Sequence, residues 1–120
     1  MKVTGIDATY YTVSDIDGLS AFYAALFGAQ PSTSMPGRLA EWTFDDGNSF
    51  GLYKVEGAGE HVNGSAMFAV DDVAQAVDAA KARGVHFHDD GEITDTPVCH
   101  MAFGEDTEKN QFILHHRKTQ

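Results

Sequence analysis

The chain has 120 residues, of which 42% are hydrophobic, and its 8 Lys and Arg against 18 Asp and Glu give a formal net charge of −10. This length and apolar content suit a single domain, residues 1–120, with a real core and no room for a second one. The negative charge repels phosphate backbones and anionic lipid surfaces, which excludes nucleic acid and membranes as favoured partners.

Two further features bear on location. The apolar runs are far shorter than the roughly 20 residues of a membrane span, and no leader pattern is recognisable, so we expect a cytoplasmic protein. Cys99 is the single cysteine and cannot form an internal disulfide, which fits a reducing compartment. We expect it to be a buried, inert thiol.

The first half of the chain begins with a strand followed by a helix. Residues 2–13 are rich in β-branched and aromatic side chains, which predicts the strand. Ser14 then opens a Ser-x-x-Asp capping sequence that ends at Asp17, so a helix is expected to begin there. Apolar residues continue at helical spacing, and Gly28 stands where a left-handed C-terminal cap is expected.

The same order returns after a glycine-rich joint at residues 57–64. Residues 65–70 predict a second strand, and Asp72 is placed to cap a second helix, with Gln75 three residues further on. Gly84 closes that helix as Gly28 closes the first. The chain therefore contains an internal repeat of about half its length.

The two halves also end alike. Residues 39–44 followed by Phe50-Gly51-Leu52 mirror residues 98–103 followed by Phe112-Ile113-Leu114. Each half thus reads as a strand, a helix and about three strands, and we expect an α+β fold with the helices covering one side of the sheets. The predicted modules are about 1–56 and about 65–120.

The chain resembles the glyoxalase, bleomycin-resistance and extradiol-dioxygenase superfamily, also called vicinal oxygen chelate proteins. The segments that carry the resemblance are V-S-D-I-D-x-L-S-x-F-Y-x-x-L-F-G (13–28), V-D-D-V-x-x-A-V (70–77) and NQFILHH (110–116). The resemblance implies two βαβββ modules whose sheets curl around an open cavity, often within a homodimer. In metal-using members, each module supplies one ligand, usually His, from its first strand and one Glu from its last. The metal then chelates vicinal oxygens of the substrate.

Carried over to this sequence, the four ligand positions fall on Ala8, Gly51, Ser65 and Ile113. None of these side chains is an imidazole or a carboxylate, the groups that the family uses. We therefore predict that the usual metal site is lost and that the protein has no cofactor. A divalent metal ion held by other residues is the alternative.

The predicted ligand-binding pocket surrounds these positions, because residues two apart on a strand share a face. Its residues are Ala8, Tyr10, Gly51, Tyr53, Ser65, Met67, Ile113 and His115. Glu41 and Trp42 are neighbours on a strand, so only one of them can face the pocket, and the sequence does not decide which. Such an aromatic and apolar wall suits a flat or greasy ligand.

Four polar side chains could form an unconventional acid–base or metal cluster in this pocket. They are His100, His115, Glu41 and Tyr53, of which the first three are the catalytic candidates. Ordinary polar lining of a pocket explains them too. His86 and His88 would share a face on a strand, but without a third ligand such a pair is typical of solvated surface. His61 lies in the joint and is expected to be part of a loop.

These observations favour metal-independent binding or sequestration of a small amphipathic or cationic aromatic molecule, similar to the bleomycin-resistance branch. The acidic composition would attract a cation, although solubility alone explains an acidic surface. The alternative is a glyoxalase-type lyase, isomerase or dioxygenase with ligands displaced to His100, His115 or Glu41. A third possibility is a protein whose homodimer surface matters and whose pocket is vestigial.

Overall fold

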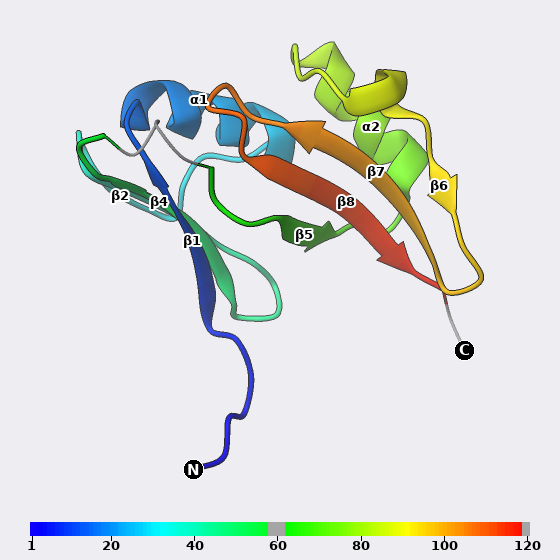
Figure 1. The fold of residues 1–120 in the computed structure, drawn as a ribbon, viewed down its shortest axis with the longest axis horizontal. Coiled ribbons are helices and arrows are strands. Elements are labelled where there is room, and N and C mark those ends of the chain that lie inside the picture. The colour runs from blue at the N-terminus through cyan, green and yellow to red at the C-terminus, as the bar shows by residue number, and fades with distance from the viewer. Residues whose placement is uncertain (58–61, 119–120) are drawn as a thin grey trace.

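The computed structural model describes residues 1–57 and 62–118 and shows the strand–helix–strands order twice (Figure 1). The first module contains β1 (Ala8–Val13), α1 (Ile16–Phe27), β2 (Thr33–Met35), β3 (Leu39–Thr43) and β4 (Ser49–Lys54). The second contains β5 (Ala66–Ala69), α2 (Val73–Ala82), the 3₁₀ helix η2 (His88–Gly91), β6 (Thr94–Asp95), β7 (Cys99–Glu105) and β8 (Gln111–Arg117). The prediction of an α+β fold made of two βαβββ modules is confirmed, and His61 lies outside the described residues.

Each module forms its own four-stranded sheet with the same topology. The strand orders are β1-β4-β3-β2 and β5-β8-β7-β6. The first strand of each module pairs in parallel with the last, and the remaining pairs are antiparallel. The registers match as well, since Ala40 lies opposite Leu52 and Ala102 lies opposite Leu114. The repeat seen in the sequence is therefore a repeat of hydrogen-bonded structure.

The register corrects the repeat at one point, the third strand of each module, β3 and β7. The sequence comparison matched Glu41 with His100, but Glu41 lies opposite Gly51, and the residue that lies opposite Ile113 is Phe103. The structural counterpart of Glu41 is therefore Phe103. His100 and Phe103 are three residues apart, and residues separated by an odd number on a strand point to opposite faces of the sheet. His100 therefore does not share the face that corresponds to that of Glu41.

Helix α1 begins and ends with side chains and backbone suited to its termini. The Asp15 carboxylate accepts a hydrogen bond from the Gly18 amide at 3.1 Å. The prediction that Ser14 opens the helix is wrong by one residue, and the Ser14 amide instead donates to the Glu108 carboxylate at 3.1 Å. Gly28 ends the helix in the left-handed conformation, with φ of 68°, as predicted.

Helix α2 follows the same plan and confirms its predicted cap. The Asp72 carboxylate accepts from the Gln75 amide at 3.0 Å. Gly84, in the left-handed region with φ of 91°, donates from its amide to Lys81 O at 2.9 Å and closes the helix. No helix in residues 1–57 and 62–118 combines the length and the apolar character needed to cross a membrane.

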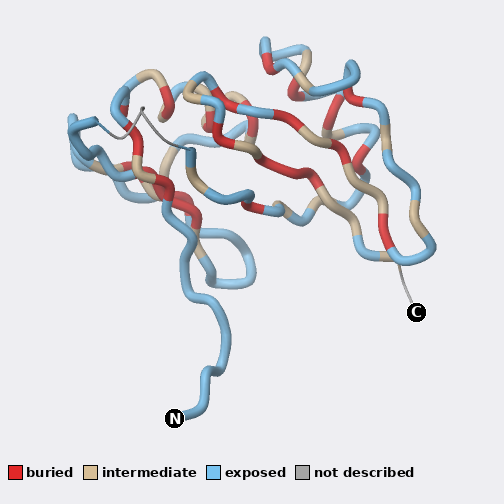
Figure 2. The backbone as a smooth tube through the Cα atoms, in the orientation of Figure 1, coloured by how far each residue is buried: buried red, intermediate tan, exposed pale blue. Residues whose placement is uncertain are grey.

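The core lies between helices and sheets and is shared by the two modules. Helix α1 packs on β3 and β4, and α2 packs on β7 and β8 (Figure 1). The Phe68 ring of β5 lies 4.9 Å from Phe27 and 5.0 Å from Phe50, measured between ring centroids. Phe112 of β8 lies 5.9 Å from Phe22. Each module therefore buries apolar surface of the other. Buried residues occur along the strands of both sheets (Figure 2).

A buried hydrogen-bond network also joins the modules. The Tyr23 hydroxyl of α1 donates to Asp106 at 2.7 Å, and Asp106 accepts from the Asn110 amide groups at 3.0 Å. Asn110 Oδ1 in turn accepts from Asn63 at 2.8 Å, and Asn63 Nδ2 donates to Thr12 O at 2.9 Å. Burial, together with the neighbouring carboxylate, raises the pKa of Tyr23, so its hydroxyl remains a donor.

Candidate functional site

The face of the first sheet that points away from α1 carries Tyr10, Glu41 and Tyr53. Tyr10 and Glu41 both lie opposite Gly51, from β1 and β3 respectively, and the Tyr10 hydroxyl donates to the Glu41 carboxylate. This hydrogen bond, with smaller effects of burial and of the Glu41 charge, raises the pKa of Tyr10 to about 12. Tyr10 is therefore a neutral phenol at physiological pH, oriented by a carboxylate.

Gly51, one of the four family ligand positions, lies beneath the Tyr10 ring. A Cβ atom built on Gly51 would stand 2.5 Å from Tyr10 Cε2, closer than non-bonded carbon atoms approach. The Tyr10 ring thus takes the space that a longer side chain at this position would need. Ala8, on the same face of β1, offers only a methyl group.

The two positions in the second module do not suit a metal either. The Ser65 hydroxyl donates to the side-chain oxygen of Gln111, and Ile113 is an apolar residue that is 8% exposed. Within residues 1–57 and 62–118, no three His, Cys, Asp or Glu side chains are close enough together to hold a metal ion. The residues at the four family positions therefore do not fit a divalent metal.

Packing in the core decides which of Glu41 and Trp42 faces the open side of the first sheet. Trp42 is 2% exposed, and its indole Nε1 donates to Ala29 O at 2.9 Å. This burial satisfies the one polar group of the indole while its rings pack on α1 side chains such as Phe27, 5.3 Å away between centroids. Glu41 therefore faces the open side of the first sheet.

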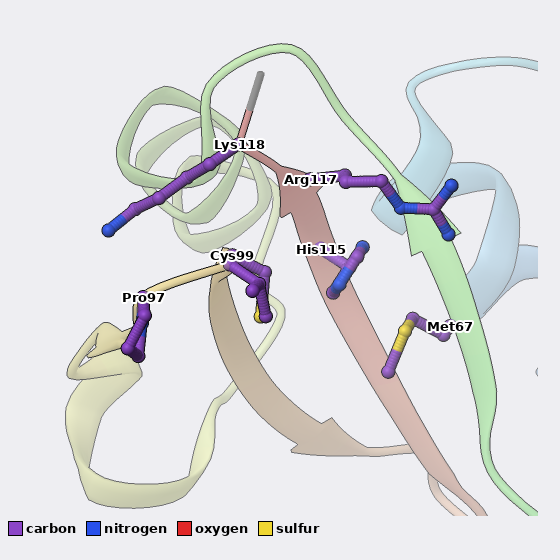
Figure 3. Close-up of a pocket in the computed structure, with 7 residues that line it drawn as sticks. Met67, Pro97, Cys99, His115, Arg117 and Lys118 are labelled. Carbon is purple, nitrogen blue, oxygen red and sulfur yellow. The ribbon is translucent and has the colours of Figure 1, made fainter. Parts of the chain in front are cut away.

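A cavity of about 440 Å³ opens on the second sheet, on the face that points away from α2 (Figure 3). Its lining residues are Met67, Pro97, Val98, Cys99, His115, Arg117 and Lys118. Of the predicted pocket residues, Met67 and His115 line it, whereas Tyr10 and Tyr53 belong to the first sheet. The structure therefore builds this cavity from the second module alone, whereas the predicted pocket drew its residues from both modules. The sequence left open whether the two modules of one pocket come from one chain or from two.

Sequence reasoning missed several of these lining residues. Arg117 could have been found, since it follows His115 by two residues on β8 and so shares its face. Lys118 and Val98 come together through tertiary pairing, with the Lys118 amide donating to Val98 O at 2.8 Å. No sequence pattern signals that contact. Cys99 is buried as predicted and lies opposite Arg117 in the β7–β8 pair.

Lys118 is held in place at the rim of the cavity. Its ammonium group donates to Asp95 Oδ1 and to Thr96 O, both at 2.6 Å. This hydrogen bond and the positive charge of Lys118 lower the pKa of Asp95. The Lys118 charge is thus locally balanced by a carboxylate.

The three catalytic candidates are not brought together. His115 faces the cavity, but His100 lies opposite His116 on the other face of β7 and β8. His100 Nε2 stands 3.3 Å from Asp95 Oδ1 there. Glu41 lies on the first sheet. His100, His115 and Glu41 therefore do not form a displaced cluster. The three-residue difference described above explains why His100 faces away from His115, and Glu41 is separate because it belongs to the other sheet.

A second hollow lies between α1, the segment after α2 and the end of β7 with the turn that follows it. Its volume is about 340 Å³, and both His86 and His88 contribute to its lining, together with Phe22 and Glu105. His88 Nε2 stands 3.8 Å from Glu105 Oε2. The two histidines therefore share one side, as the spacing suggested, although they do not lie on a regular strand.

Comparison with known proteins decides the family. The family model described as Glyoxalase/Bleomycin resistance protein/Dioxygenase superfamily matches residues 5–114. The chain belongs to this superfamily. No curated protein matches the sequence.

Solved structures of the superfamily share the fold. A glyoxalase/bleomycin resistance protein from Catenulispora acidiphila has a TM-score of 0.75 at 17% identity, over 93% of this chain and 98% of the other. A lactoylglutathione lyase from Agrobacterium tumefaciens has a TM-score of 0.76 at 16% identity, over 97% and 96%. A glyoxalase/bleomycin resistance protein/dioxygenase from Alicyclobacillus acidocaldarius has a TM-score of 0.72 at 15% identity, over 96% and 92%. At these identities the likeness is one of fold.

Proposed function

We propose that the protein binds, and thereby sequesters, a small amphipathic molecule without the help of a metal ion. The observation that carries the proposal is the composition of the four family ligand positions. They hold Ala8, Gly51, Ser65 and Ile113, and the Tyr10 ring lies over Gly51. None of these four residues offers an imidazole or a carboxylate to a metal ion, and a metal centre here would meet the Tyr10 ring as well.

The cavity on the second sheet supports binding. Its volume of about 440 Å³ lies within the range of roughly 300–1,000 Å³ typical of small-molecule sites. Its wall combines apolar side chains such as Met67 and Val98 with a few polar ones such as His115. Met67 and Val98 are 51% and 68% exposed, so a ligand that covered them would remove apolar surface from water.

Enzymatic chemistry of the glyoxalase type receives less support. It would require a reactive centre, and the candidates His100, His115 and Glu41 lie on separate faces or sheets. Homodimer formation and a cytoplasmic location remain proposals that rest on the family and on composition. Light scattering coupled to size-exclusion chromatography tests the first of these, with a mass near twice 13.0 kDa as the expected result.

The test of the proposed function is elemental analysis combined with thermal unfolding. Protein purified without chelators or affinity metals is expected to contain far less than one metal per chain. Its Tm is expected to be unchanged by nickel, zinc, iron or manganese. A small molecule present at about 100 times its Kd is expected to stabilise the protein by about 2.7 kcal/mol, a rise in Tm on the order of 10 °C. One tightly bound metal per chain would refute the proposal.

A further inference from the structure

We propose that the ligand of the second-sheet cavity is an organic anion with an apolar body, and that Arg117 binds its anionic group. This inference rests on the proposed function and specifies the ligand's charge. It reverses the expectation drawn from the net charge of −10, which favours a cation. The reason is that the lining of a cavity, and not the total charge, decides which ligand is stabilised at contact distance.

The lining is basic in an acidic protein. Of the chain's 8 Lys and Arg, two line this one cavity, Arg117 and Lys118, and His115 lies with them. None of the seven lining residues is Asp or Glu, although the chain has 18 of these. A carboxylate or sulfonate would therefore meet only cationic, neutral or apolar groups at the wall.

The two basic residues differ in what they can offer a ligand. The ammonium group of Lys118 already donates to Asp95 and to Thr96 O. The guanidinium group of Arg117 makes no hydrogen bond or ion pair with any residue in the two described ranges, 1–57 and 62–118. Its five N–H donors in a planar fork match the two oxygens of a carboxylate or sulfonate. Arg117 is thus the residue whose hydrogen-bonding capacity remains available.

The cavity changes from apolar to basic along β8. Ile113, His115 and Arg117 follow at two-residue spacing on one face of β8. Ile113 itself is buried beside the cavity, and Met67, which lies opposite it on β5, supplies the apolar lining at that end. From Ile113 to Arg117 this strip runs roughly 13 Å, at about 3.3 Å per residue. Figure 3 shows the side chains of Met67, His115 and Arg117 on the same side of β5 and β8, whereas Lys118 points the other way. A ligand lying along the strip would place its apolar body near Met67 and its anionic group at Arg117.

The experiment compares two dyes that differ in one group. The first is 8-anilinonaphthalene-1-sulfonate, and the second is 1-anilinonaphthalene, the same molecule without the sulfonate. Both are titrated against the full-length protein by fluorescence, at fixed ionic strength. Wild-type protein is expected to bind the sulfonate about tenfold more tightly than the neutral dye, because a charge-assisted hydrogen bond at a partly exposed site contributes about that much.

Two variants with the same change in net charge locate the effect. Arg117→Gln is expected to remove the tenfold preference and to leave the affinity for the neutral dye unchanged. Arg38→Gln is the matched control, since Arg38 lies beside Tyr53 on the first sheet, at 3.5 Å from its hydroxyl. It is expected to change neither affinity. Circular dichroism verifies that both variants are folded.

Three results would overturn the inference, and they differ in what else they affect. Equal binding of the two dyes, unchanged in Arg117→Gln, refutes the anion site and leaves the apolar cavity standing. An equal loss in Arg38→Gln and Arg117→Gln attributes the preference to overall charge and not to a local contact. Binding of neither dye, confirmed by an unchanged Tm, counts against the cavity as a ligand site and so against the proposed function as well.

Discussion

At the scale of single residues, Tyr10 is the side chain that most changes the site. A glycine at position 51 leaves room for the Tyr10 ring over β4, and the Glu41 carboxylate on β3 accepts a hydrogen bond from the Tyr10 hydroxyl. Three strands thereby cooperate to place one phenol where related proteins can hold a metal. The sequence located Tyr10 and Gly51 on one face, but it did not reveal that the ring covers the glycine, since this depends on a rotamer.

The Tyr10–Glu41 contact predicts a measurable pKa change. Glu41→Gln is expected to lower the pKa of Tyr10 from about 12 towards its ordinary value near 10. The neutral amide of this variant does not repel the negative charge of the Tyr10 phenolate, and it accepts a weaker hydrogen bond from the Tyr10 hydroxyl than the carboxylate does. The titration can be followed by NMR of tyrosine labelled with ¹³C at Cζ, with Tyr10→Phe used for assignment.

The control for this titration is Asp45→Asn, in the turn between β3 and β4, which removes the same charge. It is expected to leave the pKa of Tyr10 near 12. If Glu41→Gln has no larger effect than Asp45→Asn, the hydrogen bond does not control the ionisation of Tyr10.

At the scale of helices and strands, local chemistry accounts for most boundaries. Asp72, Gly28 and Gly84 act at helix ends as their residue types predict, because capping depends on side chains within a few residues. The exception is the start of α1, where Asp15 caps and the Ser14 amide is bound by Glu108. Glu108 is 94 residues away in the sequence, so only the tertiary fold could choose between two adjacent capping residues.

This difference between neighbours predicts unequal effects of truncation. Asp15→Ala is expected to lower the free energy of unfolding by about 1 kcal/mol, the usual contribution of a helix N-cap. Ser14→Ala is expected to change it by less than about 0.5 kcal/mol, because the Ser14 backbone amide keeps its partner. Urea unfolding followed by far-UV circular dichroism measures both, and a larger loss for Ser14→Ala would contradict the assignment of the cap.

At the scale of the whole molecule, packing and hydrogen bonds join the two modules. Phe68 packs against rings of α1 and β4, and the Tyr11 hydroxyl joins β1 to the second module by donating to Gln111 O at 2.5 Å and accepting from the Ala66 amide at 2.6 Å. In the part of the chain that the structure describes, the two sheets do not close around a common cavity, and the cavity of about 440 Å³ belongs to the second sheet. Shared packing and hydrogen bonds therefore join the modules at their cores, away from the open faces.

Cooperativity between modules can be measured because the only tryptophan, Trp42, reports on the first one. Urea unfolding curves from Trp42 fluorescence and from far-UV circular dichroism are expected to coincide. Phe68→Ala, in the second module, is expected to shift both curves together and to cost about 2 kcal/mol. That is less than the 3–5 kcal/mol typical of a fully buried Phe, since Phe68 is half-buried.

Val98→Ala is the matched control, because Val98 is 68% exposed and lies outside the core. Its curves are expected to overlay those of the wild type. Two separate transitions, or a Trp42 signal that does not respond to Phe68→Ala, would mean that the modules unfold independently.

The sequence by itself determined the order of strands and helices, the internal repeat and the residues at the four family ligand positions. Periodicity, capping residues and spacing within a strand are local properties, and a chain carries them before it folds. The tertiary structure alone decided the register of β7, and with it the separation of His100 from His115. It also decided that Lys118 and Val98 come together in the lining of the cavity. These features depend on which residues lie opposite one another across hydrogen-bonded strands, and an odd offset in that pairing exchanges the two faces.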